Sequence, residues 1–342
     1  MIVTKSNAFD FHKETLFVKK VFVCALLFLT ILLTFGELYP RKSQKIDLST
    51  GAGISKMLRY DDAQVYLFGE THRCTEYQQF RNVLFKYLVK EKGVRVLVEE
   101  AGYATTFLEN ETVQGRVSFS DWLDRCTSSK EDYELYQWIA DWNSGREDAD
   151  KISIIGIDIT DNIGNMQMLC QYLLKTCNFT GADVQTQRLL TAIRKQNPFS
   201  SLQLQTFQDE FLPQLIELYQ TKPEQLENVL GTQAMYLERA LLGWQEALEQ
   251  QRLRGKAEQL GDSDDVYREN CLYENFMREY QERPDTKYYG EFGAAHVLMS
   301  DYSGKIYRVQ NSFVTRLAEE GSPLNGKPVS YTHLRAHETD SY

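Results

Sequence analysis

Short apolar runs alternate with longer amphipathic segments through the middle of the chain. The runs Val65–Phe68 (VYLF), Val94–Val98 (VRVLV) and Lys151–Ile157 (KISIIGI) contain many β-branched and aromatic residues. Continuous runs of this kind are typical of strands that are buried on both faces of a sheet. Between the first two runs, apolar residues recur at helical spacing from about Thr75, and Gly93 ends that helix. The pattern therefore predicts strands that alternate with helices.

A long helical stretch interrupts this alternation. Residues 184–283 are rich in Gln, Glu and Leu and have almost no strand character, so we expect several helices there. Two short runs follow, at 287–289 and 305–309, and they are expected to be the last strands. Strands that alternate with helices form a parallel sheet with helices on its faces. The sequence therefore predicts an α/β domain over residues 61–327, with a mainly parallel sheet flanked by helices and a helical insertion before the last strands.

The N-terminal part contains an apolar run that follows two lysines. Lys19 and Lys20 precede Val21–Phe35 (VFVCALLFLTILLTF), which is typical of a signal peptide or a signal anchor. We therefore expect residues 1–36 to be a signal peptide or membrane anchor and residues 37–60 to be a linker. Cleavage and retention of the segment both stay open. In either case the body is expected to be exported or attached to the membrane, outside the cytoplasm.

The C-terminal segment, PVSYTHLRAHETDSY over residues 328–342, resembles the translated read-through of a sequencing adapter. We therefore expect it to be a non-native tail that lies outside the fold. His333 and His337 have the spacing of a metal-binding pair on a helix, but they belong to this tail and are set aside. The folded body then contains two histidines, His72 and His296.

Composition and charge exclude several classes of protein. The 342 residues include 38 Lys and Arg against 48 Asp and Glu, a net charge of −10, and no basic stripe stands out. Nucleic acid is therefore not expected as a partner, because phosphate binding needs clustered cations. Hydrophobic residues make up 42% of the chain, which excludes a mainly disordered protein. Six cysteines are too few for a disulfide scaffold of this length.

Titratable side chains follow the carboxyl ends of four predicted strands. In chain order they are Glu70 and His72, then Glu99 and Glu100, then Asp158, and last His296. Because ligands of parallel sheets bind in the crevice beyond these ends, we expect the side chains to meet at one edge. Strand neighbours face opposite sides, so only one of Glu99 and Glu100 is expected to point into the site. His72 and His296 both end a Gly-x-x-His turn.

These motifs resemble the erythromycin esterase-like superfamily over about residues 65–296. The matching segments are GETH at 69–72, EE at 99–100, GID at 156–158, GAAHV at 293–297, and YRENCLYEN at 267–275, which resembles an Arg-(Asp/Glu)-x-x-Met-x-x-Asn segment with Leu272 in place of Met. The haem-binding ChaN lipoproteins and the TIKI/TraB proteases are distant relatives with the same paired Gly-x-x-His layout. The GETH spacing is closer to these relatives, because the esterases have one more residue before the histidine.

The resemblance implies a hydrolase without an obligatory metal. His72 would take a proton from a water molecule that attacks an ester or lactone carbonyl, with Glu99 or Glu100 as its partner. His296 would stabilise the oxyanion, assisted by Arg268. The substrate would be a small molecule or a peptide. We predict that His72→Ala and His296→Ala each abolish function and leave folding intact.

Two alternatives stay open from the sequence. In a TIKI-like protease, a divalent metal would be held by the set His72, His296, Glu70 and Glu99, with an open position for water. In a ChaN-like protein, the same edge would bind haem or iron without catalysis.

Overall fold

The structure is a computed structural model of the 342-residue chain. It describes residues 46–58, 63–72, 74–120, 129–159, 162–260, 265–299, 302–303, 308–309 and 311–331. Contacts separate residues 1–47 from residues 48–342, and every element below belongs to the second unit. The predicted apolar segment at residues 21–35 lies outside the described ranges. Within those ranges, no helix combines the length and the apolar character needed to cross a bilayer.

Five strands of the described chain form one parallel sheet. They are β1 (Val65–Glu70), β2 (Val94–Gly102), β3 (Ser153–Asp158), β4 (Lys287–Gly293) and β7 (Pro328–Tyr331), in the spatial order β3-β2-β4-β1-β7. Strand β4 is therefore inserted between β1 and β2, where Tyr289 pairs with Tyr66 on one side and Leu97 on the other. This order confirms the predicted α/β fold, and it brings four carboxyl ends to neighbouring positions.

The C-terminal end of the sheet differs from the prediction. The sequence predicts a last strand over 305–309, but the strand described there is β6 (Arg308–Val309), which forms a separate antiparallel pair with β5 (Tyr302–Ser303). The edge position is instead taken by β7. The exclusion of the whole 328–342 segment from the fold was wrong for its first four residues, which pair in register with Val65 to Phe68. Val329 and Tyr331 favour a strand, and an edge strand needs a partner on one side alone.

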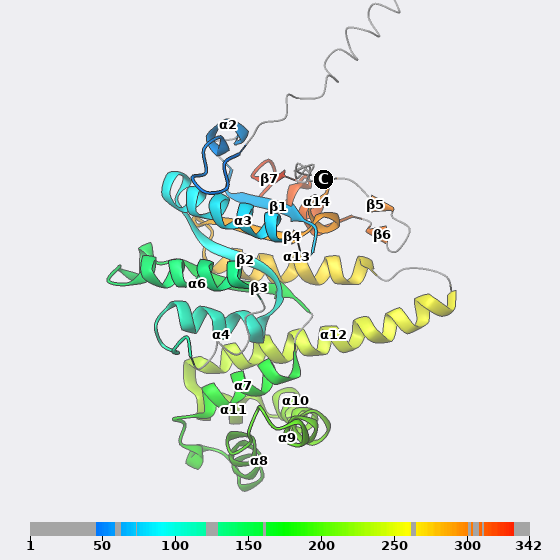
Figure 1. Cartoon of the computed structure of the whole chain (residues 1–342). Helices are drawn as coiled ribbons and strands as arrows, with labels where there is room; N and C mark the ends of the chain where they lie inside the picture. The colour runs from blue at the N-terminus through cyan, green and yellow to red at the C-terminus, as the bar shows by residue number, and fades with distance from the viewer. Residues whose placement is uncertain are drawn as a thin grey trace, which may run out of the picture. The chain divides into compact units, whose positions relative to one another are not determined.

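Helices cover both faces of the sheet and form the insertion. They are α2 (Ile54–Met57), α3 (Thr75–Tyr87), α4 (Tyr103–Val113), α6 (Lys130–Asn143), α7 (Ile163–Leu174), α8 (Val184–Arg194), α9 (Ser201–Thr206), α10 (Leu212–Thr221), α11 (Pro223–Leu230), α12 (Ala234–Leu260), α13 (Asp265–Glu282) and α14 (Phe313–Ala318). Residues 184–283 contain α8 to α13, as the helical pattern predicts. Helix α12 packs against α4, α7, α11 and α13, and Figure 1 shows α7 to α11 on one side of it and the sheet on the other.

One face of the sheet packs against α13 and α14. Leu272 and Phe276 from α13 and Phe313 from α14 lie in one apolar core with strand residues such as Val98 and Phe292, and each of them is at most 1% exposed. These strand positions are separated by even numbers of residues from the other core positions of their strands, so they share a face. Burial of this apolar surface fixes α13 over the sheet.

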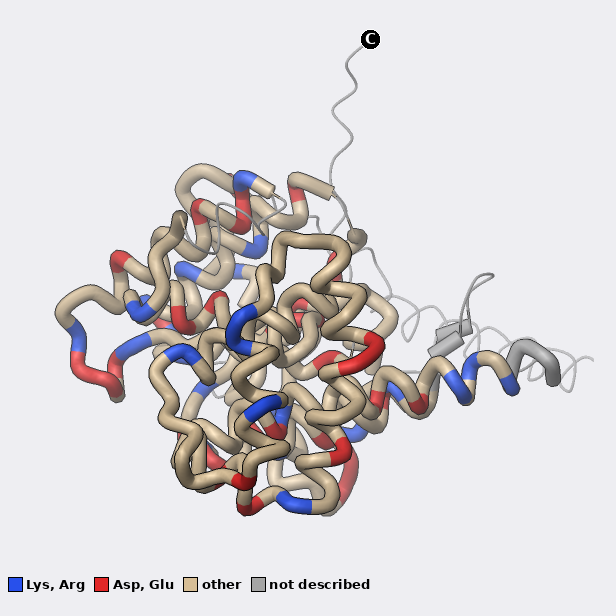
Figure 2. The backbone as a smooth tube through the Cα atoms, turned by 90° about the horizontal axis from the view of Figure 1, so that it is seen from below, with Lys and Arg blue, Asp and Glu red and all other residues tan. Residues whose placement is uncertain are grey.

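The other face packs against α3 and α6. Phe68 from β1 contacts Phe80 of α3 with ring centroids 5.1 Å apart, and Phe85 of α3 contacts Tyr289 of β4 at 5.5 Å. Both strand residues are fully buried. The C-terminal half of α12 extends away from this body with acidic and basic residues along it (Figure 2). That half includes an exposed pair in which Arg252 donates to Glu249.

Candidate functional site

The carboxyl ends of four adjacent strands hold the candidate site. Glu100 lies near the end of β2 and Asp158 is the last residue of β3. His72 follows β1 by two residues, and His296 lies in the short 3₁₀ turn that follows β4. Arg268 comes from the first turns of α13 and reaches this edge from the core face. Parallel strands with a shared register therefore bring side chains from distant parts of the chain together.

The Arg268 guanidinium connects three of these elements. Its Nε donates to Asp158 Oδ1 at 2.9 Å, and its Nη2 donates to Asp158 Oδ2 at 2.6 Å and to Glu100 Oε1 at 2.7 Å. Its Nη1 lies 3.1 Å from His296 Nε2. Burial alone would raise the pKa of Asp158, but the hydrogen bonds and charge of Arg268 outweigh it and hold that pKa below its ordinary value. The pair is therefore ionised at neutral pH.

His296 is buried between this arginine and a second carboxylate. Its Nδ1 bonds to Glu269 Oε1, and the other oxygen of Glu269 accepts the backbone N–H of Phe313 at 2.7 Å. Burial lowers the pKa of His296, but Glu269 and Glu100 raise it more, so the pKa lies above its ordinary value. Glu269 is fully buried.

Sequence reasoning missed Glu269, although it follows Arg268 directly in the segment that resembles the esterases. Consecutive residues of an α-helix point about 100° apart, so both can lie at the sheet edge when the helix axis runs across it. The helical spacing thus allowed Glu269 to reach the site beside Arg268. Whether it does so depends on where α13 packs on the sheet, and the sequence pattern does not show this.

His72 lies at the solvent side of the same edge. Its side chain is 70% exposed, and its Nδ1 bonds to Glu70, the last residue of β1. The pKa of Glu70 lies above its ordinary value, because burial and the charge of Glu100 raise it more than His72 lowers it. The partner of His72 is thus Glu70, and not Glu99 or Glu100 as expected. A residue two positions earlier is within reach because the chain turns directly after the strand.

Gly293 lies next to both Glu100 and the His72 ring. Its N–H donates to Glu100 Oε2 at 2.6 Å. A Cβ atom at this glycine would lie 3.2 Å from His72 Nε2 and 3.4 Å from Glu100 Oε2, so the His72 ring lies against this backbone. The other oxygen of Glu100 is 3.4 Å from His296 Nε2. Glu100 therefore lies between the two imidazoles, and His72 Nε2 is turned toward the interior of the site.

Glu99 lies on the opposite face of the sheet. Tyr136 of α6 donates to its two oxygens at 2.9 and 3.2 Å, and Glu109 of α4 is its hydrogen-bonding neighbour. Nearby, Arg81 lies 3.3 Å from Glu291 of β4. Burial raises the pKa of Glu291 to about 8. Glu99 therefore belongs to this second polar cluster, as the alternation of strand side chains requires for one of the two glutamates.

The metal set expected from the sequence is not assembled, because Glu99 faces away from the two histidines. Across the described ranges, no three or more His, Cys, Asp or Glu side chains are arranged to hold a metal ion. The other six predicted residues, which are Glu70, His72, Glu100, Asp158, Arg268 and His296, lie at the carboxyl edge in the contacts given above.

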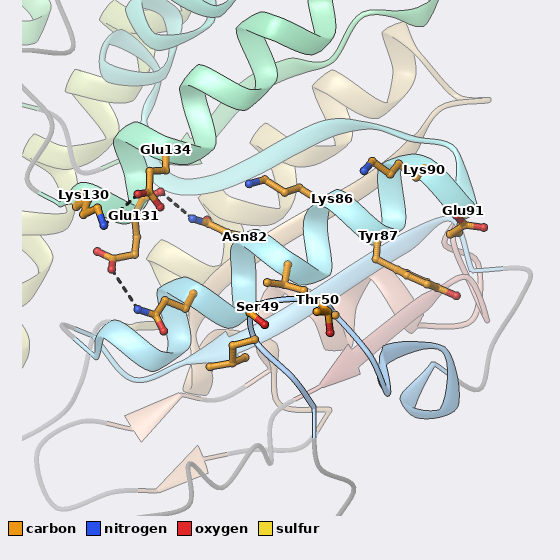
Figure 3. Close-up of a pocket in the computed structure, with 14 residues that line it drawn as sticks. Ser49, Thr50, Asn82, Lys86, Tyr87, Lys90, Glu91, Lys130, Glu131 and Glu134 are labelled. Atoms are coloured by element: carbon orange, nitrogen blue, oxygen red, sulfur yellow. Dashed lines mark hydrogen bonds and ion pairs between the residues drawn. The ribbon is translucent and has the colours of Figure 1, made fainter.

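A separate cavity of about 470 Å³ is lined by residues 48–51, by α3 and the turn that follows it, and by the start of α6. Figure 3 shows Lys86 and Lys90 along one side of it and Glu131 and Glu134 at the start of α6 on another. None of the predicted site residues lines this cavity. It is therefore distinct from the edge that holds the two histidines.

Comparisons of the sequence with protein families and with curated proteins found no match.

Three solved structures match most of the chain. A mutant of the erythromycin esterase EreC in its open conformation has a TM-score of 0.54 at 16% identity, covering 84% of this chain and 74% of that one. A protein from Bacillus cereus has a TM-score of 0.52 at 19% identity, covering 85% of this chain and 70% of that one. A succinoglycan biosynthesis protein has a TM-score of 0.52 at 17% identity, with coverage of 85% and 70%. The chain therefore shares its fold with these three structures.

Proposed function

We propose that this protein is a hydrolase that cleaves an ester, a lactone or a related bond with a water molecule activated by His72. The observation that carries the proposal is that an exposed Glu70–His72 pair and a buried group around Arg268 and His296 share one edge, with Glu100 between them. The first pair supplies a base that solvent reaches. The buried group supplies the Arg268 guanidinium as a hydrogen-bond donor.

The Glu70–His72 pair has the geometry of an oriented general base. When Nδ1–H donates to Glu70, the lone pair of the neutral ring is on Nε2. This nitrogen lies against Gly293, on the side of the ring that faces the rest of the site. A carboxylate that holds Nδ1–H fixes both the tautomer and the ring orientation, as in hydrolases that use a histidine base. His72 is therefore placed to accept a proton from water.

Arg268 is placed to stabilise the charge that develops on the substrate. In the reaction, water oxygen forms a bond to the carbonyl carbon, its proton passes to His72 Nε2, and the carbonyl π electrons move to oxygen. Collapse of this intermediate breaks the bond to the leaving oxygen, which takes up one proton. The contacts of Arg268 with Asp158 and Glu100 use Nε–H and both Nη2 hydrogens. Nη1, which lies beside His296 Nε2, is then the donor for the oxyanion.

One of the three matched structures is by name an esterase. Its likeness to this chain supports the same fold, and the contacts of Arg268 and His72 supply the separate chemical support for hydrolysis. The substrate class proposed here is thus ester or lactone, in a small molecule or a peptide.

A hydrolysis screen of the purified full-length chain tests the proposal. We expect turnover of at least one member of a panel made of 4-nitrophenyl butyrate, ethyl butyrate, a macrocyclic lactone such as erythromycin, and a peptide 4-nitroanilide. We expect EDTA to leave that rate unchanged, because His72, and no metal-bound water, supplies the base. Loss of the rate with EDTA and its return with a divalent metal would favour the metal-dependent alternative. A Soret band after haem titration, without any hydrolysis, would favour the binding alternative.

Gly293→Ala is expected to lower kcat/KM for the cleaved substrate by roughly tenfold, because misplacement of a catalytic group by a fraction of an ångström is costly. The added Cβ would contact the His72 ring at 3.2 Å and displace it from Glu70. The backbone φ of −48° accepts alanine, so folding should persist. Gly243→Ala in α12 is the matched control, since its Cβ would meet nothing within 4 Å. Equal rates for the two variants would contradict the placement of His72.

A further inference from the structure

Glu269 holds His296 from the side opposite the proposed substrate. One carboxylate oxygen bonds to His296 Nδ1 and the other accepts the N–H of Phe313 at 2.7 Å. The carboxylate therefore connects three segments, which are α13, the turn after β4 and the first residue of α14. With both oxygens occupied and the side chain fully buried, its position has little freedom. The His296 ring is consequently held with Nε2 directed at Arg268 and Glu100.

The charges around His296 decide how it holds a proton. The groups that face it are Glu269 and Arg268 from α13, Glu100 from β2 and Asp158 from β3. Burial and Arg268 oppose the imidazolium, whereas Glu269 and Glu100 favour it and prevail, so the pKa of His296 is raised. The ring thus keeps its proton to a higher pH than a free histidine does. Of these groups, Glu269 fixes the proton on Nδ1, and Nε2 is left to take and give a second one.

We propose that Glu269 is a positioning residue that makes His296 the proton donor to the leaving oxygen. This deepens the proposed function and rests on it. In the step, the Nε2–H bond of the His296 imidazolium breaks as the bond from the carbonyl carbon to the leaving oxygen breaks, and the new O–H bond forms on the alcohol. His296 is then left in the neutral Nδ1–H form that Glu269 holds. The cycle closes when His72 releases its proton to solvent and His296 takes up a proton from solvent. The net reaction converts water and an ester into an acid and an alcohol.

The dependence on the leaving group tests this role. A 4-nitrophenolate ion leaves without a proton, but an alkoxide needs one. We expect Glu269→Gln to lower kcat/KM for ethyl butyrate by about a hundredfold and for 4-nitrophenyl butyrate by no more than about threefold. The control is Glu279→Gln, which removes another buried carboxylate of α13, one that is bonded to Arg239. It is expected to change the two esters alike. Equal losses on both esters in Glu269→Gln would overturn the proposal, because a merely structural role affects them alike.

Nitrogen NMR of the His296 ring separates this proposal from the proposed function. In the wild-type chain we expect the neutral ring to carry its proton on Nδ1, with a downfield N–H signal. In Glu269→Gln, we expect the midpoint of the His296 titration to fall by about one pH unit, whether or not any ester is cleaved. A wild-type ring that carries its neutral proton on Nε2 would overturn the proposal even if the variant fails to fold. A hydrolysis screen without turnover would contradict the proposed function alone.

Discussion

Arg268→Met is expected to lower the free energy of unfolding by about 3–5 kcal/mol, the range found when one partner of a buried ion pair is removed. The Asp158 side chain is 2% exposed and would lose both of its hydrogen bonds to the guanidinium. Glu100 would lose its bond at 2.7 Å as well. Two carboxylates at the ends of β2 and β3 would then lack the guanidinium that pairs with them. Urea unfolding at pH 7 measures the change.

Controls separate this loss from a general effect of removing an arginine. Arg252→Met removes an arginine whose pair with Glu249 is exposed, and it should cost less than about 1 kcal/mol. The double variant Arg268→Met with Asp158→Asn should recover part of the loss, because the unpaired buried charge is gone. A loss in Arg268→Met no larger than in the Arg252 variant would contradict the arrangement.

The ion pair between Asp158 and Arg268 also makes the stability of the protein depend on pH. The folded-state pKa of Asp158 is lowered, so its contribution to stability is present above the ordinary value of 3.8 and is lost as the pH falls through the lower folded value. The difference between the wild type and Arg268→Met should therefore be largest near neutral pH. It should shrink in acid, where Asp158 becomes protonated.

His72→Asn is expected to lower kcat/KM for hydrolysis by about 10²- to 10⁴-fold, the usual contribution of a general base. It should change the free energy of unfolding by less than about 0.5 kcal/mol, because the His72 side chain is 70% exposed. Asparagine removes the basic nitrogen and keeps a polar side chain of similar reach. Steady-state kinetics and urea unfolding on the same preparation measure both quantities.

The matched control for this variant is Thr71→Ala, the exposed neighbour in the same turn. It should retain the rate of the wild type. A His72→Asn protein that is folded and as active as the Thr71 variant would remove His72 from the mechanism. The structure changes the expectation for His296: this ring is buried and bonded to Glu269, so His296→Ala should also reduce stability.

The position of the site at the carboxyl edge of the sheet could be predicted from the sequence, because the carboxyl ends of parallel strands lie at the same edge. Apolar runs identified β1, β2, β3 and the start of β4, and the polar residues at their ends then had to meet. Alternation along β2 also predicted that Glu99 and Glu100 face opposite sides. It did not say which of them faces α13, because that depends on which face of the sheet the helix covers.

Other features depend on packing that no local pattern contains. Glu269 acts through the exact orientation of α13 over the core, and Glu70 pairs with His72 through the turn after β1. The four residues of β7 pair with the edge of β1, which lies far from them along the chain. The apolar run at 21–35 predicts export or membrane attachment, and it lies outside the described residues. Local pattern thus predicts elements and their order, whereas side-chain partners follow from the assembled fold.

A crystal structure of the protein with a methylphosphonate monoester of the best alcohol from the screen tests the central claim most directly. This tetrahedral compound imitates the intermediate of ester hydrolysis. We expect one phosphonate oxygen within about 3.2 Å of His72 Nε2 and another at the same range from Arg268 Nη1. A phosphonate bound instead in the cavity beside Lys86 and Lys90, with the edge between the histidines empty, would contradict it.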